Sequence, residues 1–121
     1  VRSGDRVEVI GANFAAGEDN QKIEIGDDSL ISIGVEFRTS DSHSIIDLDT
    51  NRRINEARSI AVGEHVWVGT GVSILKGTFI GNHSIIGAKS LVTKDIPANA
   101  IAVGIPAKVV KTNVTWSKER I

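Results

Sequence analysis

A repeat of six residues runs through most of this chain and limits the folds open to it. From position 62 onward the sequence divides into VGEHVW, VGTGVS, ILKGTF, IGNHSI, IGAKSL and VTKDIP, and every unit begins with valine or isoleucine. The same frame fits three earlier units, which begin at Ile25, Ile31 and Phe37. A period of six differs from the roughly 3.6-residue period of a helix and fits the two-residue period of strands that turns interrupt. The repeat therefore predicts short, regularly spaced strands.

Within this repeat, alternate side chains are expected to face a common core. The fifth position of one unit and the first of the next lie two apart and share a face of a strand, while the residue between them points outward. Val66 and Val68 form such a pair, with Trp67 between them. Units this short bury little surface alone, so the repeat predicts a solenoid of coils stacked around a narrow aliphatic column. Aromatic residues make up only 4% of the chain, which suits a narrow interior.

The composition is that of one globular domain and argues against several kinds of function. The chain has 121 residues, a net charge of −1 and no cysteine. It therefore offers no basic surface for nucleic acid, no thiolate metal site and no cysteine nucleophile. No apolar run approaches the roughly 18 residues that cross a bilayer, so we expect a cytoplasmic protein that does not insert into a membrane. The chain begins at Val1 without a methionine, so an N-terminal segment could precede it.

The repeat is interrupted over residues 39–59, in the segment TSDSHSIIDLDTNRRINEARS. The earlier frame requires an aliphatic residue where His43 stands, and the frame resumes only at Val62. A polar loop of this length is uncommon in a compact repeat and is more often functional. Its apolar residues are Ile45, Ile46, Leu48 and Ile54. We expect them to lie against a neighbouring column.

Three motifs accompany the repeat and carry a family resemblance. They are HVWVG at 65–69, IGAKSLVTKDIP at 86–97 and AVGIPAKVV at 102–110. Together with the six-residue units they resemble the hexapeptide-repeat acyltransferases, in particular the galactoside and maltose O-acetyltransferases and the enzymes that modify capsule or O-antigen. The resemblance implies an all-β fold, a single-stranded left-handed parallel β-helix with three units per coil, in a homotrimer. The handedness and the number of units per coil come from the resemblance alone.

The same resemblance gives the expected layout of the chain. A single β-helix acyltransferase domain would occupy residues 1–121, with a protruding loop at about 44–59 and a C-terminal cap at about 106–121. After Pro106 the repeat is lost, and we expect a short strand followed by a partial helical turn that closes the column. Trp116 would be an apolar plug at that end or a contact to another subunit.

Residues on the outside of the column also carry a prediction. With three units per coil, residues 18 apart stack about 4.8 Å from each other. Trp67 would then lie under Ile85, and Ser73 under Leu91, with Phe79 on the third face. Outward apolar residues are either ordinary exposed hydrophobics or are covered by neighbouring columns. The trimer that the resemblance implies favours the second interpretation.

His43 stands where the resembled enzymes carry a catalytic histidine, at the start of the protruding loop, although Ser42 replaces the glycine of their Gly-His pair. A histidine titrates near neutrality, so it could take the proton of an acceptor hydroxyl that attacks the thioester of acetyl-CoA and pass it to the leaving thiolate. Asp41 lies two residues earlier and could orient the ring from the same face of an extended segment. There are two alternatives: Asp41 is an ordinary turn residue, or a main-chain carbonyl orients the ring instead.

The resemblance extends residue by residue to the two substrates. Asn13, in the segment ANF, and Trp67 would lie at the acceptor and the acetyl group. The residues expected to contact acetyl-CoA are Thr70, Ala88, Thr93, Lys94, Lys108 and Lys111. Small residues let the pantetheine arm approach the backbone, and the lysines supply positive charge for the phosphates. Solvated surface lysines and an ordinary turn asparagine remain the alternatives.

The leading interpretation is an acetyl-CoA-dependent O-acetyltransferase. It would act on a sugar or polysaccharide hydroxyl by direct transfer, without a metal. The alternatives are an N-acetyltransferase on an amino-sugar nucleotide, a serine acetyltransferase, a zinc enzyme like the β-helical carbonic anhydrases, and a non-catalytic scaffold. His65 and His83 lie 18 apart and could form a metal pair, but we expect solvated turn residues, and the close histidine pair of the zinc enzymes is absent. The sequence does not identify the acceptor, because acceptor contacts come from loops.

Overall fold

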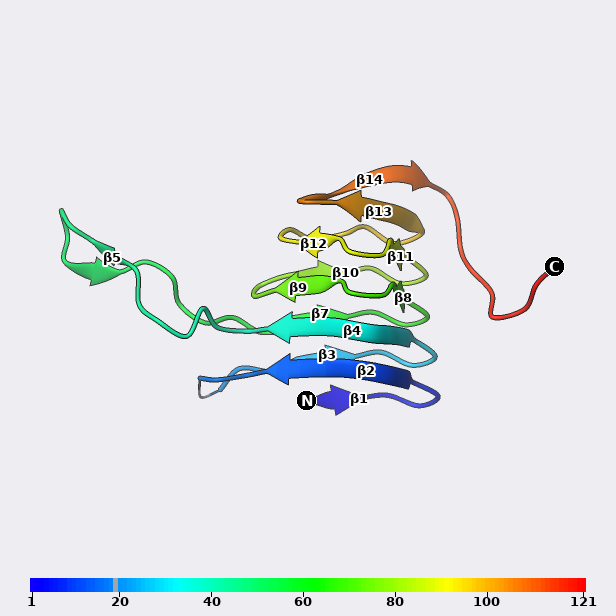
Figure 1. Ribbon diagram of the computed structural model, residues 1–121, viewed down its shortest axis with the longest axis horizontal. Coiled ribbons are helices and arrows are strands. Elements are labelled where there is room, and N and C mark those ends of the chain that lie inside the picture. The colour runs from blue at the N-terminus through cyan, green and yellow to red at the C-terminus, as the bar shows by residue number, and fades with distance from the viewer. Residues whose placement is uncertain (19) are drawn as a thin grey trace.

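The computed structural model describes residues 1–18 and 20–121 as a stack of coils, from which one loop and a C-terminal tail project (Figure 1). The described residues contain strands and no helix. The strands are β1 (Arg2–Ser3), β2 (Glu8–Ala15), β3 (Ile23–Ile25), β4 (Leu30–Arg38), β5 (Ile46–Asp47), β6 (Arg52–Arg53), β7 (Ile60–Val62), β8 (Trp67–Val68), β9 (Ser73–Leu75), β10 (Phe79–Ile80), β11 (Ile85–Ile86), β12 (Leu91–Val92), β13 (Ala100–Gly104) and β14 (Ala107–Thr112). None of the described residues forms a helix with the length and apolarity needed to cross a membrane.

The column has three faces, each a ladder of parallel strands. Strands β1, β3, β7 and β10 form the first face in that order. The long strand β4 turns a corner, so Leu30–Ile31 pair with β8 on the second face and Glu36–Arg38 pair with β9 on the third. Strands β11 and β13 continue the second face, and β12 continues the third. The expected parallel β-helix is therefore confirmed.

The strand register confirms three units per coil. Val62 pairs with Ile80, Val68 with Ile86 and Ile74 with Val92, so each partner lies 18 residues along the chain. Trp67 lies under Ile85 and Ser73 under Leu91, as predicted. Ile25, however, pairs with Val62, 37 residues away. The residues beyond one 18-residue coil belong to the interrupting loop.

The inward positions of the repeat form the core. The first position of each of the nine units is valine, isoleucine or phenylalanine and is almost completely buried. Burying one such side chain contributes about 1.5–3 kcal/mol. The fifth positions other than the exposed Asp41 are buried as well. The serines and threonine among them satisfy their hydroxyls on the backbone: Ser84 donates to Pro97 O and Thr78 to Leu75 O. Phe37 fills the column lower down, where its ring stacks on Phe14 with 4.9 Å between centroids.

The corners of the column need backbone conformations that turn sharply. His65 and His83 have φ values of 51° and 65° and turn the corner between the first and second faces. Gly71 and Lys89, with φ values of 70° and 65°, turn the next corner. This left-handed region is uncommon outside glycine, but single residues adopt it in turns. The two histidines are therefore turn residues, as predicted.

The C-terminal segment differs from the sequence-based expectation. Strand β14 is the expected short strand, and it pairs antiparallel with β13 and covers its open edge. No helical turn follows it, so that part of the prediction is wrong. Trp116 does not plug the end of the column. Its indole stacks on the His65 ring at 4.1 Å and donates a hydrogen bond to His65 O over 2.7 Å.

His65 is correspondingly less solvated than predicted. Its side chain is 20% exposed, its Nδ1 lies 2.8 Å from Asp28 Oδ2, and its Nε2 lies 2.8 Å from Trp116 O. Both partners are acceptors, so both hydrogen bonds form together only when the ring carries a proton on each nitrogen. The bond to His65 lowers the pKa of the Asp28 carboxyl. This corner thus fastens the C-terminal tail to the side of the column.

Candidate functional site

The interrupting loop extends from the column as a two-stranded hairpin of β5 and β6 (Figure 1). Its tip is a turn in which Asp47 Oδ1 accepts hydrogen bonds from Asp49 N and Thr50 N. Where the loop rejoins the column, Arg58 N donates to Thr39 O. Its apolar residues remain on the surface of the single chain, and Leu48 is 94% exposed.

His43 lies in the stem of this loop with its side chain exposed. The preceding residue, Ser42, has a φ of 69°, and its N–H donates to Ser40 Oγ over 3.0 Å. A left-handed backbone is the conformation that glycine adopts most easily. Ser42 therefore holds a backbone conformation that a glycine at this position would adopt without strain.

Asp41 lies beside His43 in the stem, but its hydrogen bonds go to other side chains. Its Oδ2 accepts from Lys76 Nζ at 2.6 Å and from Asn55 Nδ2 at 2.9 Å. These two bonds, that of Lys76 foremost, lower the pKa of the Asp41 carboxyl. Lys76 thus ties the stem to the column, and an orienting contact between Asp41 and the ring of His43 stays a prediction.

Several other predicted residues lie near the corner from which the loop leaves, here called the loop corner. Arg38 pairs with Leu75, and Leu91 pairs with Ser73, so the turns after β4, β9 and β12 lie one above another. These turns contain Thr39, Lys76, Thr93 and Lys94. Asn13 lies opposite Glu36 on the third face, which leads to this corner, and is exposed.

The remaining predicted residues lie around the preceding corner, here called the tryptophan corner. Trp67 is 40% exposed on β8, and Thr70 and Ala88 occupy successive turns directly after β8 and β11. Lys89 N donates to Thr70 O, which fixes the two turns together. Lys108 and Lys111 extend from β14 above β13 on the same face. One chain therefore carries two separated groups of predicted site residues and does not bring them together.

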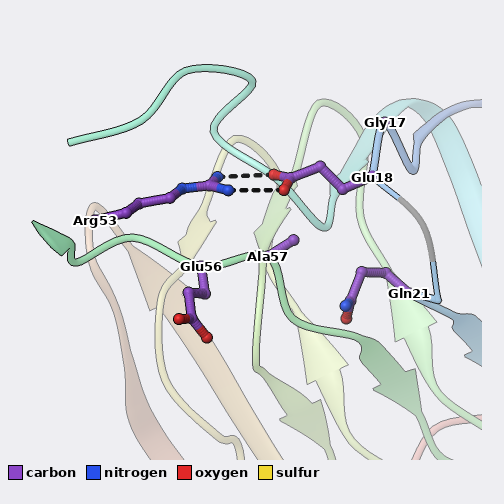
Figure 2. Close-up of a pocket in the computed structure, with 6 residues that line it drawn as sticks. All are labelled: Gly17, Glu18, Gln21, Arg53, Glu56 and Ala57. Atoms are coloured by element: carbon purple, nitrogen blue, oxygen red, sulfur yellow. Dashed lines mark hydrogen bonds and ion pairs between the residues drawn. The ribbon is translucent and has the colours of Figure 1, made fainter. Parts of the chain in front are cut away.

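A polar cleft of about 600 Å³ opens where the loop approaches the turn after β2 (Figure 2). Its lining residues are Gly17, Glu18, Gln21, Arg53, Glu56 and Ala57. Arg53 Nη1 and Nη2 donate to Glu18 Oε1 and Oε2, both over 2.9 Å. Ser40 Oγ also donates to Glu18. Carboxylate, amide and guanidinium groups of this kind can hydrogen-bond a molecule rich in hydroxyls.

Sequence reasoning missed Glu18, Arg53 and Asn55. Glu18 and Arg53 are 35 residues apart, and no local pattern marks them as partners. The six-residue frame begins at Ile25 and does not place Glu18, so no sequence signal points to this contact.

The Glu18–Arg53 ion pair should make stability depend on pH. The hydrogen bond from Arg53, followed by that from Ser40, lowers the pKa of Glu18 from 4.5 to about 2. Because the folded pKa lies below the unfolded one, this stabilisation is complete above pH 4.5 and is lost as the pH falls towards 2. We expect Glu18→Gln to lower the urea midpoint at pH 6 and to match wild type near pH 2. A constant difference across this range would contradict the assignment.

None of the groups of histidine, aspartate and glutamate among the described residues is arranged to hold a metal ion. The His65 and His83 rings lie close, with 5.4 Å between centroids, but the nitrogens of His65 face Asp28 and Trp116.

Comparison with known proteins relates this site to an enzyme family. No protein-family model matches the chain. The polysialic acid O-acetyltransferase of Escherichia coli O1:K1 is 43% identical over 109 residues, which are 90% of this chain and 36% of that protein. A hexapeptide-repeat acetyltransferase of Vibrio cholerae, solved in complex with acetyl coenzyme A, superposes with a TM-score of 0.77 at 28% identity, over 92% of this chain and 59% of that one. The homologues of this chain are O-acetyltransferases of the hexapeptide-repeat family.

A further hexapeptide-repeat acyltransferase structure superposes on this chain more closely than the Vibrio cholerae structure does. The crystal structure of a polysialic-acid-specific acetyltransferase superposes with a TM-score of 0.90 and 41% identity, over 98% of this chain and 54% of that one. As in the family, the coils form a left-handed parallel β-helix. The chain spans between about a third and three fifths of the length of these three relatives.

Proposed function

We propose that this protein is an acetyl-CoA-dependent O-acetyltransferase that modifies a hydroxyl of a sugar or polysaccharide. The observation that carries the proposal is the 43% identity to a polysialic acid O-acetyltransferase over 90% of the chain. The acetyl coenzyme A bound in the Vibrio cholerae relative supports the choice of donor. The exposed His43, in the stem of the loop, provides the group that the reaction needs.

His43 acts as the general base. One ring nitrogen takes the proton of the acceptor hydroxyl while the oxygen attacks the acetyl carbonyl, so that a carbon–oxygen bond forms. The carbon–sulfur bond then breaks, and the imidazolium returns the proton to the thiolate of coenzyme A. The products are an acetyl ester and free coenzyme A, and no covalent enzyme intermediate is required.

The active site lies between neighbouring chains of a homotrimer. One chain supplies His43, Thr93 and Lys94 from its loop corner, and the next supplies Trp67, Thr70 and Ala88 from its tryptophan corner. The separation of these groups on one chain supports this arrangement. The apolar loop residues and the outward Phe79, which is 47% exposed, provide surface that a neighbouring column would bury.

A thiol-release assay with acetyl-CoA and a panel of acceptors tests the proposal. The panel holds a sialic acid polymer, a galactoside, an amino-sugar nucleotide and serine. We expect release with a saccharide hydroxyl, a product that alkaline hydroxylamine cleaves as an ester does, and no loss of rate with a chelator. A hydroxylamine-resistant amide product would instead favour the N-acetyltransferase. Activity that a chelator abolishes would favour the zinc enzyme.

A further inference from the structure

A single buried amide holds the stem of the loop. Asn55 is 6% exposed. Its Oδ1 accepts hydrogen bonds from Ile45 N at 2.7 Å and from Arg53 Nε at 3.2 Å. Its Nδ2 donates to Asp41 Oδ2 at 2.9 Å and to His43 O at 2.8 Å. Both lone pairs and both N–H groups of the amide are therefore used.

The environment of Asn55 fixes the orientation of its amide. The two groups that face Oδ1 are N–H donors, and the two that face Nδ2 are a carboxylate and a carbonyl, which only accept. A flipped amide would place like groups against each other at all four contacts. An aspartate of the same shape would lose both donors and bring an oxygen against Asp41 and the carbonyl of His43.

We propose that Asn55 is a positioning residue that holds His43 in place for proton transfer; the inference rests on the proposed function. The amide bonds the side chain of Asp41 before His43 and the backbone groups His43 O and Ile45 N, so it holds the chain on both sides of the His43 side chain. A base held in this way does not have to be ordered as the substrates react.

The column supports this amide through a second layer of contacts. Arg53 donates with Nε to Asn55. With Nη1 and Nη2 it donates to Glu18, which belongs to the turn after β2 (Figure 2). On the other side, Lys76 anchors Asp41. The stem is thus connected to the first and third coils, although the side chain of His43 that it carries is exposed.

The Asn55→Asp variant tests the inference, with Asn51→Asp as the matched control because Asn51 is an exposed asparagine of the same loop. We expect Asn55→Asp to lower kcat about 10- to 100-fold, as misplaced catalytic groups do, with little change in the KM for acetyl-CoA. Asn51→Asp should keep the wild-type kcat. If Asn55→Asp does not fold, Asn55→Ser, which can retain a donor, takes its place in the same comparison.

Combining the change with His43→Ala separates positioning from a general structural role. If Asn55 acts through His43, Asn55→Asp lowers kcat in wild type but leaves the residual rate of His43→Ala unchanged. An equal loss in both backgrounds, or a wild-type kcat for Asn55→Asp, would overturn the inference while leaving the proposed function standing. A wild-type rate for His43→Ala itself would refute the assignment of His43 as the base and, with it, this inference, although the acetyltransferase activity would stand.

Discussion

Replacing His43 with alanine is expected to lower the turnover of acetyl transfer by at least about a hundredfold, the lower end of what a general base contributes. If His43 is the base, as proposed, its removal leaves the acceptor hydroxyl without the group that takes its proton as it attacks the thioester. The fold should be unaffected, because the His43 side chain is exposed and the bond from Asn55 that holds the loop stem goes to the His43 main-chain carbonyl, which alanine keeps. The measurement is kcat from thiol release at saturating acetyl-CoA, beside the circular dichroism spectrum of each protein.

His83→Ala is the matched control for this experiment. His83 is also exposed in a sharp turn with a φ of 65°, but it lies away from the loop corner, between the first and second faces. We expect it to retain wild-type turnover. Equal turnover in wild type and His43→Ala would refute the assignment of the base, whatever the acceptor.

Replacing Phe37 with alanine is expected to lower the free energy of unfolding by about 3–5 kcal/mol, the usual cost of deleting a buried phenylalanine ring. Phe37 is 0% exposed and stacks on Phe14, with an angle of 11° between the ring planes. The column is narrow, so few neighbouring side chains can move into the cavity. Urea unfolding followed by circular dichroism measures the change.

Phe79→Ala provides the comparison, because Phe79 points outward and is 47% exposed on the single chain. We expect it to cost clearly less than Phe37→Ala in the unfolding of each chain, although it could weaken contacts between chains. A loss at Phe79 as large as that at Phe37 would contradict the inward and outward assignment of the repeat.

Much of the column could be predicted from the sequence because its information is local and periodic. The spacing of Val62, Val68 and Ile74 fixes which side chains face the core, and each lies at most 3% exposed. The same frame gives the stacking of Trp67 under Ile85. The position of the loop could be predicted because the six-residue repeat is interrupted there.

Contacts between distant segments could not be predicted in this way. Asn55 reads as an ordinary polar residue of a loop, and its importance depends on backbone groups ten and twelve residues away. The docking of Trp116 on His65 joins residues 51 apart, with no repeat to relate them. The short strand expected after Pro106 is β14, but no helical turn follows it, because the segment beyond β14 instead places Trp116 against His65.

The most direct test of a site shared between chains is complementation in mixed oligomers. Chains with His43→Ala lack the base, and chains with Ala88→Trp have a blocked tryptophan corner, so each variant alone should be inactive. Coexpressed in equal amounts, they should recover about a quarter of wild-type activity, because one in about four neighbouring pairs unites an intact loop corner with an intact tryptophan corner. Mixed oligomers that stay as inactive as the two parents would show that both corners must come from the same chain, and would contradict the shared site.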